Sequence, residues 1–236
     1  MKKIRVKFVS TAGDEKENIF TRILRKRYDV VLSDDPEYVF SSVYDNQILN
    51  YNCIRICFTG EAVTPNLNFY AYVMGFDKGL TYDDRCFYLP IYKPTIWGDS
   101  RERELVLKRE LLTKDDLSKK DLFCTMVLSN GFGSEMRAKV FQAVNSYKPV
   151  SSGGGMYNNI GERVKDKIAF QLRSKFVIAC ENGEFPGYCT EKMADAYASD
   201  AIPIYWGSPL VAEEFNENSF IDVRKFATLD DLVAEI

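Results

Sequence analysis

The amino-acid sequence predicts an α/β fold made of two Rossmann-like lobes. In the first half of the chain, strand-like apolar alternation gives way to helical spacing and then returns to extended runs. A charged, leucine-bearing segment occupies residues 98–120, and after it the alternation of strands and helices starts again. Because alternating strands and helices form parallel sheets covered by helices, the two halves predict two such lobes.

The first predicted lobe comprises residues 1–100. Residues 4–9 alternate as a strand does, and residues 15–28 carry apolar side chains at helical spacing. Further extended runs are expected at residues 29–32, 38–40 and 54–58. The order strand, helix, strand, strand, with turn residues between them, favours a Rossmann-like sheet over a β-sandwich.

Residues 101–120 are predicted to connect the lobes. Their sequence, RERELVLKRELLTKDDLSKK, is rich in helix formers and in charge. Leucines at positions 105, 107, 111 and 112 provide an apolar side. We therefore expect an amphipathic connecting helix with a solvated face.

The second predicted lobe comprises residues 121–236. Its pattern begins with a strand and a helix, followed by an irregular glycine-rich stretch over residues 149–155. The expected strands are 123–128, 176–180 and 202–206, and the expected helices are 134–147, 190–199, 209–215 and 229–235.

Composition excludes several classes of protein. The chain has 236 residues, of which 46% are hydrophobic, so it can bury a sizeable core. It has no histidine, which excludes Ser-His-Asp and Cys-His hydrolases and the HExxH zinc enzymes. If the protein is an enzyme, its general base is expected to be a carboxylate.

Net charge and cysteine pattern predict the kind of partner and the redox state of the thiols. A net charge of −3 argues against nucleic acid as the main partner. The six cysteines form no CxxC pair, and four lie in apolar runs, so reduced, buried thiols are expected rather than a disulfide framework or a metal site. No signal peptide and no run of 18 apolar residues is found, which predicts a cytoplasmic protein.

Ligands of α/β sheets bind beyond the carboxyl ends of the strands, so the residues that follow each predicted strand are the candidates for a binding site. In the segment 176–209, Thr190 is a candidate N-cap for a helix that begins at Glu191. Glu191 suits hydrogen bonding to a ribose or sugar diol, and Lys192 suits phosphate. The alternative is that Glu191 only complements the helix dipole and that Lys192 is a solvated surface charge. Glu181 and Asn182, at the strand end, either face the ligand or satisfy turn backbone.

Two further positions suggest chemistry. Arg137 lies near the start of a helix after a turn with two glycines, where its guanidinium could bind a diphosphate, or it could form a surface salt bridge. Glu61 follows a glycine at a strand end and could accept a proton from a sugar hydroxyl. The chain contains no Asp-x-Asp triplet for a metal-bound diphosphate, which favours Arg and Lys as the neutralising charges.

The stretch ACENGEFPGYCTEKMADAYASDAIPIYWGSP, followed by FNENSFIDV, resembles the signature of the α-1,3-fucosyltransferases, glycosyltransferase family 10. The resemblance extends upstream through SNGFGSEMRAKVFQAVNSYKPVSSGGG, LPIY and FTGEAVTPN with YVMGFD. It covers residues from about 55 to 226. It implies the GT-B architecture, in which two Rossmann-like lobes face a central cleft, the first holding the acceptor and the second the donor GDP-fucose.

By this resemblance, Glu61 matches the general base of the family and Arg137 its diphosphate-binding arginine. The remaining donor-site residues of the motif ENxxxxGYxTEK are Asn182, Tyr188, Glu191 and Lys192. The implied reaction inverts the anomeric centre and moves L-fucose from GDP-β-L-fucose to the 3-hydroxyl of GlcNAc in an N-acetyllactosamine-type glycan. It implies no metal ligands and no required cofactor, and it leaves stimulation by a divalent metal open.

Two residues depart from the family pattern. Cys189 stands where valine is common, and Glu162 stands where bacterial relatives often have tyrosine, which puts an aromatic contact there in doubt. The heptad repeats and basic tail of some bacterial relatives are not present in this chain, so membrane contact cannot be read from it. Peripheral attachment to the inner membrane remains open for a longer native chain. The alternatives to this function are a GT-B transferase that uses another GDP-sugar and a non-catalytic module that binds a nucleotide sugar or glycan.

Overall fold

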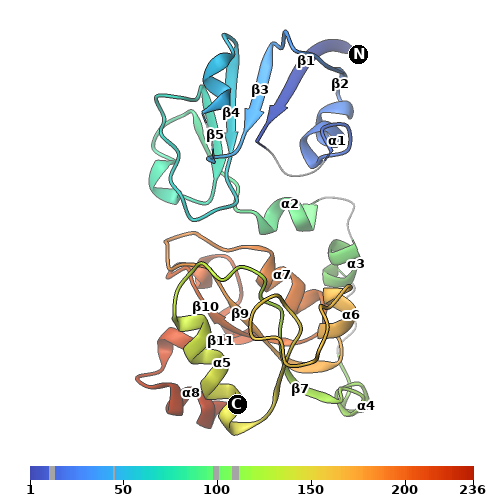
Figure 1. The fold of residues 1–236 in the computed structure, drawn as a ribbon, viewed down its shortest axis with the longest axis vertical. Helices are drawn as coiled ribbons and strands as arrows, with labels where there is room; N and C mark the ends of the chain where they lie inside the picture. Colours follow the sequence, from blue (N-terminus) through green and yellow to red (C-terminus); the bar gives the residue numbers. More distant parts are fainter. Residues whose placement is uncertain (11–13, 45, 98–100, 108–111) are drawn as a thin grey trace. The chain divides into compact units, whose positions relative to one another are not determined.

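A computed structural model describes residues 1–236 except 11–13, 45, 98–100 and 108–111. The chain divides into two compact units, Met1–Pro94 and Thr95–Ile236. Each unit contains one sheet whose named strands pair in parallel (Figure 1), so the predicted α/β class with two Rossmann-like lobes is confirmed. The segment 101–120 lies in the second unit by this division.

The first unit contains a six-stranded sheet in the order β2-β1-β3-β4-β5-β6. The predicted strands of this unit are all present, with small differences at their ends, whereas the helix expected over residues 15–28 is shorter, Ile19–Arg25. Strands β5 and β6 were not predicted, because these short segments become strands by pairing with β4 and with each other. The elements are β1 (Lys2–Val9), α1 (Ile19–Arg25), β2 (Tyr28–Leu32), β3 (Tyr38–Ser41), β4 (Ile54–Phe58), β5 (Tyr72–Gly75) and β6 (Cys86–Tyr88).

Both faces of the first sheet are covered by apolar side chains. Neighbouring residues of one strand point to opposite faces, so each strand contributes to two apolar clusters. On one face, Phe8 and Phe40 pack with Phe20 of α1. On the other face, Val39 and Cys57 are buried in a separate apolar cluster. The adjacent residues Val39 and Phe40 of β3 thus serve different sides, as expected of a buried parallel strand.

The second unit contains a five-stranded sheet in the order β11-β10-β9-β7-β8. Its strands are β7 (Leu122–Met126), β8 (Val150–Ser152), β9 (Ser174–Cys180), β10 (Ile202–Trp206) and β11 (Ile221–Asp222). Helix α2 (Tyr92–Trp97) spans the boundary between the units. The other helices are α3 (Arg101–Leu107), α4 (Lys114–Ser118), α5 (Met136–Tyr147), α6 (Lys167–Gln171), α7 (Glu191–Ala198) and α8 (Leu229–Glu235).

Three expectations for the second unit need correction. The stretch 149–155, expected to be irregular, contains edge strand β8, in which Val150 pairs with Cys124 of β7. The single helix expected over residues 101–120 is represented by α3 and α4, and Leu111 lies outside the described residues. The short helix expected at 209–215 is a 3-10 helix, Val211–Glu213. Helix α6 was not predicted, because five residues give little periodicity.

Helices cover both faces of the second sheet. Ile178 of β9 packs in the cluster that contains Val140 of α5 and Leu232 of α8. Its neighbour Val177 packs with Ala196 of α7 on the opposite side. Residues 176–180 of β9 are therefore a continuous apolar run, and the candidate site lies at the carboxyl end of this strand, where ligands of parallel sheets bind.

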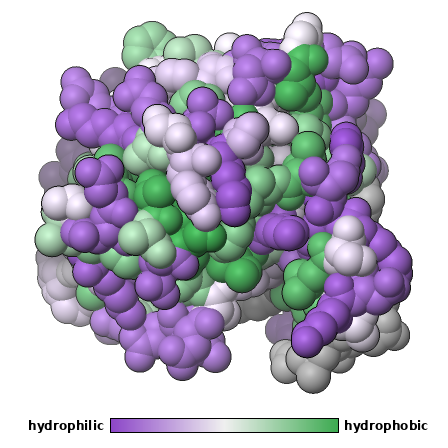
Figure 2. Space-filling view, turned by 90° about the horizontal axis from the view of Figure 1, so that it is seen from below, coloured by the Kyte–Doolittle hydropathy of each residue, from purple (hydrophilic) through white to green (hydrophobic). Residues whose placement is uncertain are grey.

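The exterior is largely polar in the view of Figure 2, where hydrophilic side chains surround a central area in which apolar residues reach the surface. Among the helices of the described residues, none has both the length and the apolar character that crossing a membrane requires.

All six cysteines are free thiols; five are buried, as expected from the sequence, whereas Cys53, expected to be buried, is only partly so. Burial raises the pKa of Cys57, Cys180 and Cys189 to about 12. Near pH 8 such a thiol is ionised in roughly one molecule in ten thousand, and the thiolate is the reactive form.

We therefore expect these three cysteines to react with iodoacetamide at least about 100-fold more slowly in the folded protein than after unfolding in guanidinium chloride. Site-resolved mass spectrometry measures the rates, with the partly exposed Cys53 as the internal reference. Equal labelling of Cys53 and the buried thiols in the native protein would contradict the packing described above.

Candidate donor and base sites

The candidate donor site lies at the carboxyl end of β9 in the second unit. The strand ends at Cys180, and the next two residues are Glu181 and Asn182. A loop then leads to Thr190 and the first turn of α7. Strand, loop and helix thus bring residues 181–192 together at one edge of the sheet, as the sequence predicted.

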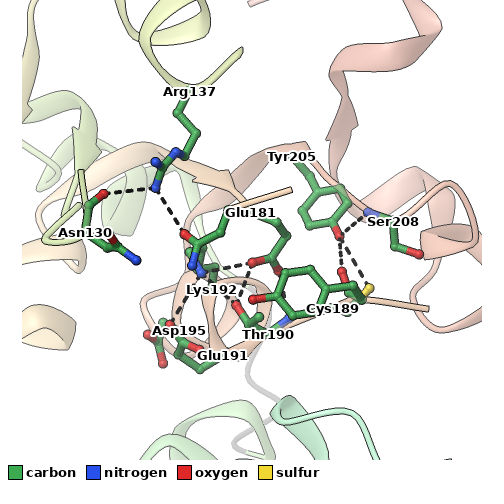
Figure 3. Close-up of polar contacts among 12 residues, drawn as sticks. Asn130, Arg137, Glu181, Cys189, Thr190, Glu191, Lys192, Asp195, Tyr205 and Ser208 are labelled. Carbon is green, nitrogen blue, oxygen red and sulfur yellow. Dashed lines mark hydrogen bonds and ion pairs between the residues drawn. The ribbon is translucent and has the colours of Figure 1, made fainter. Parts of the chain in front are cut away.

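Glu181 is the buried centre of this arrangement, with a relative exposure of 0%. Its Oε1 accepts a hydrogen bond from the Thr190 backbone N–H at 2.7 Å. Its Oε2 accepts from the Thr190 hydroxyl at 2.7 Å and from Lys192 Nζ at 2.9 Å (Figure 3). Thr190 occupies the predicted N-cap position, but its hydroxyl makes no capping bond; it donates to Glu181 and accepts from Lys192 instead. The carboxylate therefore fixes the start of α7.

Lys192 is held in place by Glu181 and remains charged. Its Nζ also donates to Thr190 Oγ1 at 2.8 Å and lies 3.7 Å from Glu191 Oε1. Burial lowers the pKa of Lys192, but the carboxylates of Glu181 and Glu191 outweigh this and raise it above its ordinary value. Burial raises the pKa of the Glu181 carboxyl group. The Lys192 ammonium lowers that pKa, but by less than burial raises it.

Glu191 lies at the rim of the site, and its side chain is 40% exposed. Burial raises the pKa of Glu191, but the ammonium groups of Lys192 and Lys167 lower it to a greater extent. The carboxylate is therefore ionised at neutral pH and able to accept hydrogen bonds from ligand hydroxyls.

Arg137, the second residue of α5, is 4% exposed. Its Nη1 donates to the Asn130 carbonyl oxygen at 3.2 Å and to Asn182 Oδ1 at 3.0 Å (Figure 3). Its Nε donates to the Ser134 carbonyl oxygen at 3.4 Å. Among the interactions of the described residues, those of Arg137 are with neutral oxygens, so its positive charge is not paired with a carboxylate.

Gly133 allows the loop before α5 to approach this guanidinium. A Cβ atom at position 133 would lie 2.3 Å from Arg137 Nη2 and 2.8 Å from the Asn182 carbonyl oxygen. Because both neighbours belong to the candidate site, any side chain at position 133 would displace one of them.

Tyr188 lies inside the loop and is only 2% exposed. Its carbonyl oxygen accepts a hydrogen bond from the Tyr205 hydroxyl at 3.4 Å, and that hydroxyl accepts from the Ser208 backbone N–H at 2.9 Å. Sequence reasoning did not select Tyr205, whose hydroxyl also lies 3.4 Å from Cys189 Sγ. Its position two residues before the Gly207–Ser208 turn was the available signal. Tyr205, a residue of β10, thus holds the loop in place through its hydroxyl group.

A narrow crevice of this site has three cationic side chains in its wall, Arg137, Lys167 and Lys192. Its free volume is about 10 Å³, room for about one water molecule. Lys167 was not selected from the sequence, because the helix that carries it, α6, was not predicted. Its Nζ lies 2.6 Å from Asp195 Oδ2 of α7.

Glu61, the predicted base, lies in the first unit, after the end of β4. It lines a pocket of about 610 Å³ formed within that unit, together with Tyr44, Phe58 and Arg22. The Glu61 carboxylate accepts a hydrogen bond from the Tyr44 phenol; burial and this bond raise the pKa of Tyr44 to about 12. The pocket volume is in the range typical of small-molecule sites, and its aromatic and carboxylate lining suits a sugar.

The structure thus brings Arg137, Asn182, Glu191 and Lys192 together and places Tyr188 in the same loop, whereas Glu61 belongs to the other unit. Among the residues that the structure describes, no group of three or more His, Cys, Asp or Glu side chains is placed to hold a metal ion.

The buried ion pair of Glu181 provides a direct test of this geometry. Replacing Glu181 with glutamine keeps the shape but removes the buried carboxylate of Lys192, whose ammonium then has only the partly exposed Glu191 at 3.7 Å. Because breaking a buried pair from one side costs about 3–5 kcal/mol, we expect Glu181→Gln to lower the free energy of unfolding by that order in urea titrations. The exposed Glu184 of the same loop is the matched control, and Glu184→Gln should change stability by less than about 0.5 kcal/mol. Equal stability of the two variants would show that Glu181 does not fix α7.

Comparison with known proteins adds to this geometry. Residues 6–94 match the family described as alpha-(1,3)-fucosyltransferase FucT N-terminal domain. Residues 117–236 match the family described as glycosyltransferase family 10 (fucosyltransferase) C-term. The chain is 33% identical to alpha-(1,3)-fucosyltransferase FucT of Helicobacter pylori, in an alignment that covers 94% of this chain and 54% of that protein. It is 27% identical to a putative fucosyltransferase of Acanthamoeba polyphaga mimivirus, covering 86% of this chain and 34% of the relative.

Solved structures of fucosyltransferases share the fold. A crystal structure of an alpha1,3-fucosyltransferase with GDP-fucose superposes with a TM-score of 0.81 at 30% identity, covering 100% of this chain and 78% of the other. A crystal structure titled alpha1,3-fucosyltransferase gives a TM-score of 0.84 at 29% identity, covering 99% and 77%. The chain spans about half the length of the Helicobacter pylori relative and about a third of the mimivirus relative.

Proposed function

Because the chain belongs to glycosyltransferase family 10, the fucosyltransferases, we propose that it transfers L-fucose from GDP-β-L-fucose to a glycan hydroxyl. The proposed acceptor is the 3-hydroxyl of GlcNAc in an N-acetyllactosamine-type glycan, which gives an α-1,3 linkage. The proposed GT-B enzyme acts in the cytoplasm and requires no cofactor.

One observation supports the donor most strongly. Arg137 is a buried guanidinium without a carboxylate partner among the described residues, and Lys192, also charged, lines the same crevice. Burying an unpaired charge is costly, so such an arginine is expected where an anion completes the site. A diphosphate matches it, because a guanidinium can bind phosphate oxygens with two parallel N–H groups.

In the proposed reaction, the Glu61 carboxylate takes the proton from the acceptor's 3-hydroxyl. The hydroxyl oxygen forms a bond to C1 of fucose while the bond between C1 and the β-phosphate oxygen breaks, so the β-linked donor yields an α-linked product. The electron pair of the broken bond leaves with GDP. Arg137 and Lys192 stabilise the negative charge that grows on the diphosphate, which lowers the barrier because the interaction strengthens in the transition state.

Asn182, Tyr188 and Glu191 complete the proposed donor site. Asn182 orients Arg137 through its Oδ1. Glu191, ionised at the rim, accepts hydrogen bonds from sugar hydroxyls and offsets positive charge on the fucose ring. Tyr188 shapes the loop from its buried position.

The test of the donor is a panel of GDP-sugars incubated with the protein and N-acetyllactosamine, with GDP release as the readout. GDP-fucose should be consumed with the highest kcat/KM. If another GDP-sugar had the highest kcat/KM, that sugar would be the donor in place of GDP-fucose. If GDP-fucose bound without turnover on any acceptor, the protein would be a binding module.

A further inference from the structure

The third cation of the crevice, Lys167, has no part in the reaction as described above. Its side chain comes from the first residue of α6, which follows β8. Arg137 comes from α5 after β7, and Lys192 from α7 after β9. Since β9, β7 and β8 are neighbours in the sheet, three successive strand–helix connections each deliver one cation to the same crevice.

Lys167 is fixed in position but keeps donor capacity. Its Nζ donates to Asp195 Oδ2 at 2.6 Å, and the side chains are 28% and 8% exposed, respectively. An ammonium group has three N–H donors, and the contact recorded for Lys167 within the described part of the chain uses one of them. Asp195 therefore orients the ammonium and leaves two N–H groups for an anion.

Charge around the crevice also favours an anion. Two of its three cations pair with buried carboxylates: Lys192 with Glu181, which is 0% exposed, and Lys167 with Asp195, which is 6% exposed. Glu191 adds a third carboxylate, which is 40% exposed at the rim of the site. Leaving Glu191 out, the other five charged groups carry one net positive charge, that of Arg137, because Lys192 pairs with Glu181 and Lys167 with Asp195. A diphosphate brings more negative charge than one arginine neutralises.

We propose that Lys167 donates hydrogen bonds to the diphosphate of the bound nucleotide as a third cation beside Arg137 and Lys192, with Asp195 as its positioning residue. This inference rests on the proposed function, because it takes the ligand to be a guanosine diphosphate sugar. An alternative role for Lys167 is only to tie α6 to α7 through its ion pair with Asp195.

The test compares the binding of GDP, GMP and guanosine by calorimetry in the wild type, in Lys167→Met and in Lys165→Met. Lys165 is the matched control, because it is an exposed lysine two residues away that does not line the crevice. A charge-assisted hydrogen bond contributes enough for about a tenfold change in affinity. We expect Lys167→Met to reduce the ratio of GDP to GMP affinity by about tenfold and to leave guanosine binding and the Lys165→Met values unchanged.

The two proposals fail differently in this experiment. If the wild type binds GDP and Lys167→Met keeps the wild-type ratio of GDP to GMP affinity, with or without a loss of thermal stability, the lysine is only structural and this inference is wrong. If the wild type does not bind GDP, the proposed donor is wrong and the inference falls with it. A reduced ratio together with restoration by Lys167→Arg supports the inference, because arginine keeps the charge.

Discussion

Glu61→Gln is expected to reduce kcat for fucosyl transfer by about 10²–10⁴-fold, the range that a general base contributes. Glutamine keeps the size of the side chain but cannot accept the proton of the acceptor hydroxyl. GDP binding should be unchanged, because the predicted donor residues belong to the other unit of the chain. Initial rates of GDP release and GDP affinity by calorimetry measure the two effects separately.

Glu17 is the matched control for this experiment, because its carboxylate lines the same pocket as Glu61. Glu17→Gln should retain most of the wild-type rate. The chain has no histidine, so the acidic limb of the kcat/KM profile should report a carboxylate, and Glu61→Gln should abolish that limb. If Glu17→Gln lowered the rate of GDP release and Glu61→Gln did not, Glu17 rather than Glu61 would be the general base.

Arg137→Met is expected to lower kcat/KM for GDP-fucose by about 10²-fold. Hydrogen bonds to a charged group contribute about 1.5–3 kcal/mol each, and the guanidinium is expected to contact the diphosphate directly. Arg137→Lys should lose less, since lysine keeps the charge but not the planar fork. The loss should appear in the affinity for GDP as well as in the rate.

Lys139→Met is the control for Arg137→Met. Lys139 is on the same helix, its side chain is 57% exposed, and it forms an ion pair with the exposed Glu135. Near-UV circular dichroism of each variant checks that the fold is retained. Wild-type GDP affinity in a folded Arg137→Met protein would exclude Arg137 as a diphosphate ligand.

The elements that could be predicted are those with a strong local pattern. Strand β10 and helix α8 occupy the residues expected of them, because an apolar run or an apolar helical face is visible within the segment itself. Strands β5, β6 and β8 and helix α6 are short and lack such a local pattern, so their identity depends on neighbours far along the chain. Val150, for example, becomes a strand residue by pairing with Cys124.

The candidate site likewise contains residues that have a local signal in the sequence and residues that do not. Residues 181–192 form a compact segment of the sequence, so their proximity could be expected before any fold was known. The pairing of Lys167 with Asp195, 28 positions apart, depends on the packing of α6 against α7 and has no local signal. Glu181 was noticed at the strand end, but only its complete burial distinguishes a buried anion that fixes a helix from an ordinary turn residue.

The most direct test of the central claim is the structure of the product. The protein is incubated with GDP-β-L-fucose and N-acetyllactosamine, and the linkage and anomeric configuration of the purified product are determined by NMR. The account predicts α-L-fucose on the 3-hydroxyl of GlcNAc, formed with one GDP for each fucose transferred. A β-linked product would contradict the inverting mechanism, and the absence of fucosylated product with every GlcNAc-containing acceptor would contradict the proposed function.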